Sequence, residues 1–496
     1  MQLDPVFLSR IQFAVTIGFH YLFPPLTIGL GLLMVIMEWR YVRTGDRIYE
    51  SMARFWTRLF ALVFAIGVAS GIVMEFQFGT NWATYSRYVG DIFGAALAAE
   101  GIFAFFLESG FLAVLVFGWD RVSTRMHFFS TVMVSLGSMF SAIWIVVANS
   151  WQQTPAGFEL STQVFPDGSQ MAVAQLTAFW AAVFNHSTLQ RLSHVLIGAM
   201  IAGAFFVLSV SSYYLLRQRH EEFARRSIAI ALPFALVFCL LALVTGDWQG
   251  KNVAQYQPAK LAAMEGQYRT QSRAPLHIFG VPNDATEKVD YGLALPGMLS
   301  FLVHRDTQGK IVGLDAFPKA DRPPVQLTFQ AFHAMVALGM LMIGLTIVGT
   351  ALLPGGRLFR QRWLLRICVL AIIAPIAANH LGWITAEVGR QPWIVHPTYD
   401  TAASGWTPLG GLRTADAASK SVSATEVLIS IVLVSVIYAL LLITWLFVMD
   451  RKIKAGPESP EELAATAARR KSGWFDVART RADHAGESMT DARDPE

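Results

Sequence analysis

Side chains that can bind metals or move protons recur inside long apolar stretches of this sequence. These residues are His20, Glu100, Glu108, His194, His333, Met335, His380 and Glu387. A charged or strongly polar side chain in hydrocarbon costs at least a few kcal/mol, so each one is by itself a hypothesis of function. Histidine, methionine and carboxylate can all ligate haem iron, and a Met/His pair is typical of low-spin electron-transfer haem. A single His or carboxylate leaves room for another ligand.

Four of these residues share one predicted depth: His20, Glu100, His194 and Met335. Counted from the outer end of its apolar stretch, each lies about seven or eight residues in, roughly 10–12 Å at 1.5 Å per residue. Ser141 has the same count, and Glu387 lies nearer the outer end of its stretch. Independent structural residues would have no reason to line up, so we expect one layer of iron-binding side chains near the outer face.

Several neighbouring residues have a plainer interpretation. We expect His127, His333 and His380 to be structural rather than ligands, and only its depth distinguishes Met335 from other methionines. The small residues after His194 would leave space for a flat macrocycle, but ordinary close helix packing is the favoured reading. These small residues are Gly198, Ala199, Ala202 and Gly203.

One helical face carries His380, Trp383, Glu387 and Arg390, which are spaced i, i+3, i+7 and i+10. Arg390 could neutralise Glu387 or bind a haem propionate. Arg191, one turn before His194, could do the same. The alternative for both arginines is snorkelling to the membrane surface.

The apolar stretches are numerous enough for nine membrane crossings. Of the 496 residues, 54% are hydrophobic and 15% are charged, with a mean hydropathy of +0.44. Roughly 20 apolar residues cross one bilayer. The predicted crossings lie near 12–38, 55–76, 92–118, 127–149, 187–215, 226–246, 327–353, 364–386 and 425–449. We therefore predict an all-α integral membrane protein.

Basic residues follow alternate crossings. They are Arg40, Arg43, Arg47, Arg54 and Arg58, then Arg121 and Arg125, Arg217, Arg219, Arg225 and Arg226, Arg357, Arg360, Arg362 and Arg366, and finally Arg451, Lys452 and Lys454. The positive-inside rule makes these loops cytoplasmic, the N-terminus periplasmic and the C-terminus cytoplasmic. The same distribution accounts for the net charge of +4 and the pI near 9.0 without nucleic acid.

Four regions follow from this topology. Residues 1–246 hold crossings one to six, 247–326 form a large periplasmic loop, 327–450 hold crossings seven to nine, and 451–496 form a cytoplasmic tail. The 247–326 loop and a second outer loop at 150–186 are long enough to be functional. The tail from about 455 has no apolar stripe, so we expect it to be solvated.

The two cysteines constrain how a haem could be held. Cys239 and Cys368 lie singly in separate crossings, which leaves neither a disulfide framework nor a C-x-x-C-H haem attachment. Any haem would therefore be bound non-covalently.

Four segments have long and unusual sequences. They are GRQPW at 389–393, MEFQFGTNW at 74–82, the run 100–108, and KLAAME at 260–265. Through them, almost the whole chain resembles subunit I of the cytochrome bd-type quinol oxidases. The resemblance implies two haems b, one low-spin and one high-spin, and one haem d or a third haem b in its place.

The resemblance also implies roles for individual residues. His194 and Met335 would be the axial ligands of the low-spin haem b. His20, Glu100 and Glu387 would serve the high-spin pair, and which of them ligates which iron is left open. The remaining correspondences are Lys260 and Glu265 with the quinol-oxidation loop, Trp383 with an aromatic between haems, and Glu108, Ser109 and Ser141 with a proton route.

The family implies a bacterial cytoplasmic (inner) membrane protein that forms a heterodimer with subunit II. A small single-span subunit is a further candidate partner, and the substrates would be ubiquinol or menaquinol and dioxygen. Two features depart from the commoner pattern. His333 replaces an Arg that the family often has two residues before the Met ligand, so the low-spin haem loses a fixed positive neighbour. The shorter outer loop, with WQQTP at 151–155, is similar to the cyanide-insensitive branch.

The family resemblance and the depths of the intramembrane residues together predict one mechanism. Quinol docks at the 247–326 loop, Glu265 accepts a proton, and Lys260 pairs with that carboxylate or with a quinone oxygen. Dioxygen is reduced to water with protons drawn from the cytoplasm past Glu108, about 12 Å deeper than Glu100. This arrangement would generate a membrane potential without proton pumping.

Two other classes compete with the oxidase. A proton-coupled transporter would also place Glu and His inside a bundle, but the sequence has no inverted repeat or paired broken helices. A haem b subunit of a quinol dehydrogenase would need neither an oxygen site nor a series of carboxylates.

Overall fold

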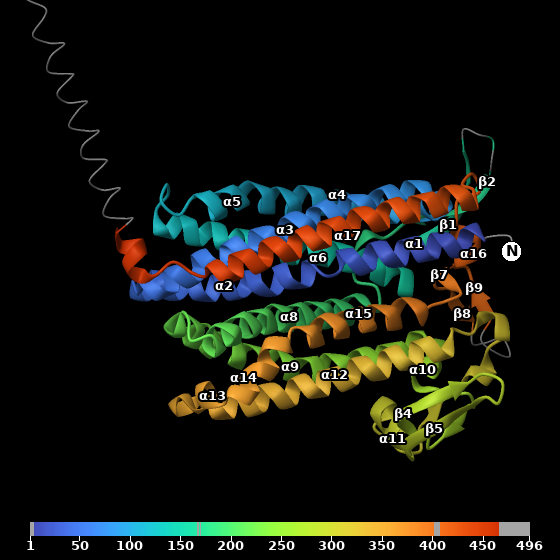
Figure 1. Cartoon of the computed structure of the whole chain (residues 1–496). Coiled ribbons are helices and arrows are strands. Elements are labelled where there is room, and N and C mark those ends of the chain that lie inside the picture. Colours follow the sequence, from blue (N-terminus) through green and yellow to red (C-terminus); the bar gives the residue numbers. More distant parts are fainter. Residues whose placement is uncertain (1–3, 166–167, 169, 401–406, 466–496) are drawn as a thin grey trace, which may run out of the picture.

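Long helices form a bundle in the computed structural model, which describes residues 4–165, 168, 170–400 and 407–465. Within these residues, nine helical segments are long and apolar enough to cross a membrane (Figure 1). They are α1 and α2 (Pro5–His20, Pro24–Thr44), α3 (Arg47–Thr80), α4 to α5 (Ala83–Ala99, Phe106–Phe117), α6 (Thr124–Gln153), α8 (Thr188–Leu216), α9 (Glu221–Tyr256), α12 (Val325–Leu352), α14 and α15 (Arg362–Leu370, Ile373–Val388) and α17 (Ala424–Ala455). Each overlaps one predicted crossing, so the all-α membrane fold is confirmed.

Two crossing segments are interrupted where chemistry-bearing residues lie. Helix α1 begins after Asp4, whose side chain caps its first turn, and ends at His20. Helix α2 begins at Pro24, and the break after His20 follows from this proline, which lacks an N–H and restricts the residue before it. In the third segment, a π-helix (η1, Glu100–Phe105) separates α4 from α5. Such turns are frequent at functional sites.

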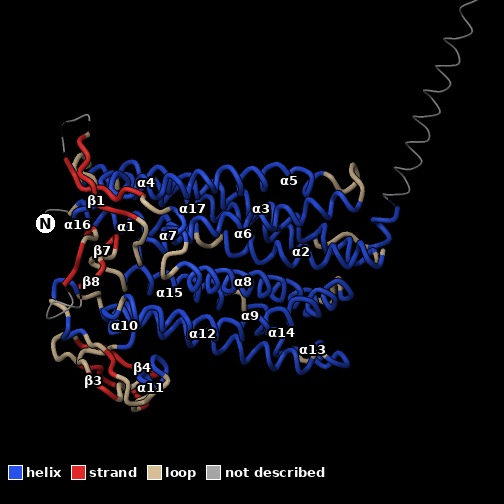
Figure 2. The backbone as a smooth tube through the Cα atoms, turned by 180° about the vertical axis from the view of Figure 1, so that it is seen from behind, coloured by secondary structure: helices blue, strands red, loops and turns tan. Residues whose placement is uncertain are grey.

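Short elements gather at one end of the bundle, which we call the loop end (Figures 1 and 2). They are β1 (Phe158–Val164), β2 (Gln170–Leu176), α7 (Phe179–Val183), α10 (Pro258–Glu265), β3 (Gln271–Ser272), β4 (Leu276–Asn283), β5 (Lys288–Leu295), α11 (Met298–His304), β6 (Lys310–Ile311), η2 (Leu314–Ala316), η3 (Lys319–Asp321), β7 (Trp393–Val395), β8 (Thr398–Asp400), β9 (Thr407–Leu409), β10 (Leu412–Arg413) and α16 (Thr414–Ala417). The strands pair antiparallel as β1–β2, β3–β6, β4–β5, β7–β10 and β8–β9. The short elements η4 (Pro354–Gly356) and α13 (Arg357–Arg360) lie at the opposite end.

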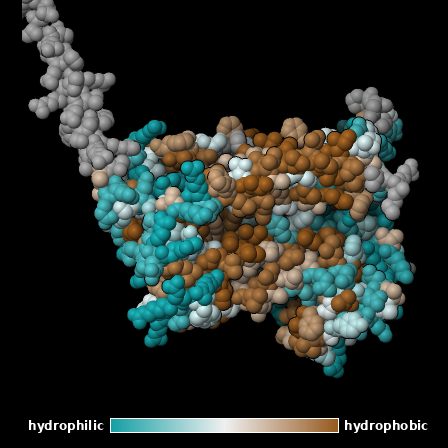
Figure 3. All heavy atoms as spheres, in the orientation of Figure 1, coloured by the Kyte–Doolittle hydropathy of each residue, from teal (hydrophilic) through white to brown (hydrophobic). Residues whose placement is uncertain are grey.

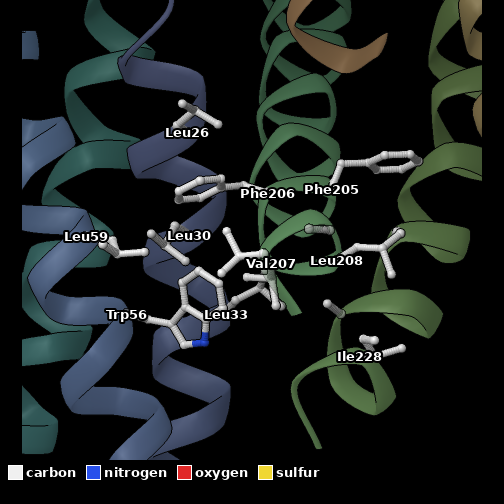
Figure 4. Packing of buried hydrophobic residues seen from close by; sticks show 14 of the residues in the cluster. Leu26, Leu30, Leu33, Trp56, Leu59, Phe205, Phe206, Val207, Leu208 and Ile228 are labelled. Carbon is white, nitrogen blue, oxygen red and sulfur yellow. The ribbon is translucent and has the colours of Figure 1, made fainter. Parts of the chain in front are cut away.

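Close helix packing forms the centre of the bundle. Figure 4 shows Leu30, Leu33, Trp56 and neighbouring side chains meeting between α2, α3, α8 and α9. Glycine allows the α2–α8 contact, because a Cβ on Gly29 would lie 2.1 Å from the Ala199 carbonyl oxygen. Lipid is as apolar as leucine, so van der Waals contact rather than water exclusion drives this packing. The packing interpretation of the small residues after His194 is confirmed for Ala199.

The outer surface matches a membrane environment. In the view of Figure 3, hydrophobic residues form a band across the middle of the bundle, and hydrophilic residues gather at its two ends. The two cysteines, Cys239 and Cys368, are buried and unpaired, as expected.

Two helices extend beyond their predicted ends. Helix α9 continues to Tyr256, ten residues past the predicted crossing, and α6 continues to Gln153. Polar residues can continue a helix beyond the hydrocarbon until a proline follows, here Pro258 and Pro155. The first ten residues of the predicted 247–326 loop are therefore helical.

The start of the predicted tail is ordered against the bundle. Residues 460–465 are helical and Leu463 is buried. Ser51 on α3 donates a hydrogen bond of 2.5 Å to the Glu458 carbonyl. Most of residues 456–465 are exposed or half-exposed, as expected of a solvated tail, and only Pro457 and Leu463 among them are buried. The remainder, 466–496, lies outside the described residues.

Candidate functional site

His194 and Met335 lie in a ring of contacting helices, α8, α9, α12 and α15. His194 on α8 has its Nδ1 3.0 Å from Oγ1 of Thr245 on α9. Met335 on α12 lies against Gly382 on α15, where an added Cβ would be 3.0 Å from the Met335 Sδ. Glycine therefore lets the thioether approach the α15 backbone.

Contacts between α8 and α15 set the heights of these two residues. Asn379 on α15 donates to the Gly198 carbonyl of α8 at 3.4 Å. The two helices run in opposite directions, so His194 lies about 6 Å and Gly382 about 4.5 Å nearer the loop end than this contact. Because Met335 contacts Gly382, the imidazole and the thioether lie at similar heights.

The candidate carboxylates lie at two heights along α6. Glu387 Oε1 accepts a hydrogen bond of 3.1 Å from Asn149, and Glu100 Oε1 accepts one of 2.6 Å from Ser141. Ser141 precedes Asn149 by eight residues, about 12 Å along the helix. The predicted layer is thus more than two helical turns thick. This agrees with the count from the predicted helix ends, which put Glu387 nearer the outer end than Glu100.

Hydrogen bonds divide the five histidines of the crossing segments into two classes. His127, His333 and His380 have both ring nitrogens occupied. The partners are Glu38 Oε1 and the Leu115 carbonyl for His127, the Phe329 and His277 carbonyls for His333, and the Ile376 and Gly18 carbonyls for His380. His20 and His194 use only Nδ1, and no hydrogen bond joins either Nε2 to a described residue. Of these five histidines, only His20 and His194 keep a ring nitrogen free for iron.

A network of charged and amide side chains lies at the loop end between α6, α8, α15 and α10. Arg390 Nη2 lies 2.5 Å from Glu387 Oε2, so Arg390 pairs with Glu387 as the spacing predicted. Arg191 donates to the Asn149 side chain. The Nε atoms of Arg191 and Arg390 are buried and have no hydrogen-bond partner among the described residues. Two unpartnered guanidinium donors fit a carboxylate-bearing ligand such as a haem propionate.

Lys260 and Glu265 occupy α10 at the edge of this network. Lys260 Nζ donates to the side chains of Gln153 and Gln257, the latter at 2.7 Å. Of the two alternatives for Lys260, pairing with the Glu265 carboxylate is excluded, because five residues of helix put the two side chains about 140° apart. Burial raises the pKa of Glu265 to about 8, and its Oε2 has no hydrogen-bond partner among the described residues. Burial, then the charge of Arg191, lowers the pKa of Lys260 well below its usual value.

An open groove adjoins Glu265. Residues lining it include Gly266, Tyr268, His277 and Lys288. His277 is tied to Glu265, since its Nδ1 lies 3.0 Å from the Glu265 carbonyl. His333 Nε2 lies 2.9 Å from the His277 carbonyl. His333 precedes Met335 by two residues on α12, so this contact links the Met335 region of α12 to the loop that contains His277.

Glu108 and Ser109 differ in their surroundings. Glu108 is buried against α6, where a Cβ on Gly137 would lie 2.5 Å from the Glu108 Cγ. Ser109, the next residue along α5, is exposed, and no hydrogen bond joins its side chain to a described residue of α6. The structure therefore brings Glu108, Glu100 and Ser141 to one face of α6 and leaves Ser109 outside that group.

Several residues of the site escaped the sequence reasoning. Ser70 and Thr245 contact the two ligand candidates, and Gln153 binds Lys260. Glu38, which pairs with His127, is a carboxylate inside a predicted crossing, and that signal could have identified it. Trp383, named as an aromatic near the haems, directly follows the Gly382 that Met335 contacts.

Comparisons with known proteins agree on one family. The sequence profile of "Cytochrome bd terminal oxidase subunit I" matches residues 8–457. The chain is 36% identical to cytochrome bd ubiquinol oxidase subunit 1 of Bacillus subtilis, over 91% of this chain and 94% of that protein. It is 33% identical to cytochrome bd-II ubiquinol oxidase subunit 1 of Escherichia coli, over 92% and 98%. A solved bd oxidase structure from Geobacillus thermodenitrificans matches with a TM-score of 0.80 and 30% identity, covering 92% of this chain and 99% of that one.

Proposed function

The chain belongs to the cytochrome bd terminal oxidase subunit I family, and from this premise we propose how its own residues serve the oxidase reaction. Family membership makes it a multi-pass protein of the bacterial inner membrane that acts in a terminal quinol oxidase with haem as cofactor. It supports the oxidase over a proton-coupled transporter or a quinol dehydrogenase subunit.

His194 and Met335 hold a low-spin haem b, and His20, Glu100 and Glu387 serve a high-spin haem b and a haem d, or a third haem b in its place. When bound, these groups carry single electrons and bind dioxygen. The observation that carries this assignment is the free Nε2 of His20 and of His194, which the other three histidines lack. Arg191 and Arg390 bind propionates through their unpartnered Nε atoms.

Quinol binds at the groove beside Glu265. Glu265 takes a proton from the quinol hydroxyl through its unpartnered Oε2, since a base whose pKa lies near the working pH is effective. Lys260, held by Gln153 and Gln257, donates to a quinone oxygen. Trp383, which follows the Gly382 that Met335 contacts, serves as the aromatic between the haems. The quinone is ubiquinone or menaquinone.

Protons for water formation arrive from the opposite end of the bundle along α6. Glu108, which is buried against Gly137 of α6, passes these protons toward Glu100. The hydrogen-bond partner of Glu100 is Ser141, which also lies on α6. The loop end then faces the periplasm and the opposite end, with its arginines, faces the cytoplasm. Protons are released on one side and consumed from the other, which generates a membrane potential without pumping. Subunit II, with a small single-span subunit, completes the enzyme.

A visible spectrum of the dithionite-reduced enzyme and an oxygen-electrode assay with quinol test this proposal together. The expected result is haem b and oxygen-site bands together with quinol-dependent oxygen consumption. A colourless protein contradicts the proposal, and low-spin haem b alone with no oxygen uptake indicates a dehydrogenase subunit.

A further inference from the structure

His20 and His194 each face the same two-residue unit on a neighbouring helix. On α3 the unit is Ser70-Gly71, and on α9 it is Thr245-Gly246. Each imidazole Nδ1 lies 3.0 Å from the hydroxyl oxygen of its unit. The two units lie far apart in the sequence, yet each supplies a hydroxyl followed directly by a glycine.

The hydroxyl protons are already used within their own helices. Ser70 Oγ donates to the Ile66 carbonyl at 2.9 Å or to the Gly67 carbonyl at 3.0 Å, and Gly67 also lies within reach of the imidazole. Thr245 Oγ1 donates to the Leu241 carbonyl at 3.1 Å. A hydroxyl has one proton, so a hydroxyl that donates to its own helix accepts from the ring. In that arrangement the ring proton sits on Nδ1, and the lone pair of each neutral imidazole is on Nε2.

The glycines give the imidazole rings room. A Cβ on Gly71 would lie 3.2 Å from Cε1 of His20, and a Cβ on Gly246 would lie 3.6 Å from Cε1 of His194. The first contact is tighter than an ordinary van der Waals contact and the second is ordinary. Any side chain at 71 would press the ring edge away, whereas an alanine at 246 fits.

We infer that Ser70-Gly71 and Thr245-Gly246 are two cradles whose hydroxyls fix the tautomer of His20 and His194, with Gly71 also leaving room for the His20 ring, so that Nε2 is the iron-binding atom of each. Ser70 and Thr245 are thus positioning residues, and the inference rests on the proposed haem ligation. An imidazole that donates its Nδ1–H is a more basic ligand. A more basic ligand favours oxidised iron, so loss of either hydroxyl raises the midpoint potential of the haem that its own histidine binds.

The test is a spectroelectrochemical titration and an electron paramagnetic resonance spectrum of the purified holoenzyme. Thr245→Val keeps the shape of the side chain but removes the acceptor, so the low-spin haem midpoint potential should rise. Thr245→Ser restores the hydroxyl and should return the wild-type value. Ser70→Ala should shift only the high-spin signals. An unchanged low-spin potential and spectrum in Thr245→Val overturns the cradle.

His194→Ala separates this inference from the proposal on which it rests. If His194→Ala keeps the low-spin band, the ligation itself is wrong. If it loses that band while Thr245→Val changes nothing, only the cradle is wrong. Should Thr245→Val fail to assemble, two glycine variants carry the test. Gly71→Ala should change the high-spin spectrum and Gly246→Ala should leave the low-spin one intact, and the reverse pattern contradicts the cradle.

Discussion

Nδ1 of His127 lies 2.6 Å from Oε1 of Glu38, and both side chains are only 1% exposed. Thr131 donates to the other carboxylate oxygen at 2.5 Å, and His127 Nε2 lies 3.0 Å from the Leu115 carbonyl. This pair therefore connects α2, α5 and α6 away from the haem layer. A buried polar group without its partner is costly, so the pair must form whenever these helices assemble.

Glu38→Gln should lower the stability of the assembled protein. Loss of the carboxylate leaves buried donors on His127 and Thr131 poorly matched, which we expect to cost about 2–3 kcal/mol. Thermal unfolding of the purified enzyme measures this as a lower midpoint. Glu221→Gln is the control, because Glu221 and Arg225 form an ion pair that is about half exposed and worth at most about 1 kcal/mol. Equal midpoints for the two variants would show that the buried pair contributes nothing special.

Quinol oxidation should accelerate as the pH rises through about 8. Glu265 has a pKa raised to about 8 by burial, and only its ionised form can accept a proton. Glu265 is then ionised in about a tenth of the enzyme molecules at pH 7 and in about nine tenths at pH 9. Initial rates with saturating quinol measure this. Glu265→Gln should abolish the rise of the rate with pH. Glu159→Gln, a substitution of an exposed residue, should retain that rise. A flat profile in the wild type removes Glu265 as the base.

Glu108→Gln should slow turnover while the haem spectra stay intact. Transfer of a proton by a positioned carboxylate contributes roughly 10²-fold or more, and the amide cannot supply it. Oxygen uptake and the reduced spectrum measure the two properties on one sample. Ser109→Ala is the matched control, because the exposed Ser109 lies outside the α6 group. A variant that loses the oxygen-site bands would instead assign Glu108 a structural role.

Met335→Leu should convert the low-spin haem to high spin. Leucine fills the space against Gly382 but offers no sulfur ligand. The electron paramagnetic resonance spectrum of the oxidised enzyme checks this. Met340→Leu is the control, since Met340 lies five residues further along α12 and is 55% exposed. A low-spin signal that persists in Met335→Leu takes Met335 off the ligand set.

The crossing helices could be predicted from the sequence because hydropathy is a local signal. The signal for the break after His20 is also local, since Pro24 cannot continue a helix that begins before it. Helix ends were less predictable. Gln153 and Tyr256 continue helices into polar surroundings, where composition no longer distinguishes helix from loop.

Partners across helices could not be predicted in the same way. Ser70 lies fifty residues from His20, and Gln153 lies 107 residues from Lys260. Nothing in a single sequence reports such pairings, because serine and glutamine are common in helices. The choice between the Glu265 carboxylate and a quinone oxygen as the partner of Lys260 was left open for a related reason: the helical turn of α10 separates Lys260 from Glu265, and a list of residues does not display this.

The π-helical turn at Glu100 decides where the next carboxylate points. Eight residues separate Glu100 from Glu108, and an uninterrupted α-helix would put them about 80° apart around its axis. The wider turn takes up about one extra residue, so the spacing acts like seven, about 20° short of two full revolutions. Both carboxylates then face α6. Deleting one residue from 100–105 would leave a plain α-helix in which Glu108 still faces α6. Straightening the π turn with all eight residues kept would instead rotate Glu108 about 80° from Glu100, so the turn absorbs the extra residue and keeps the two carboxylates in phase.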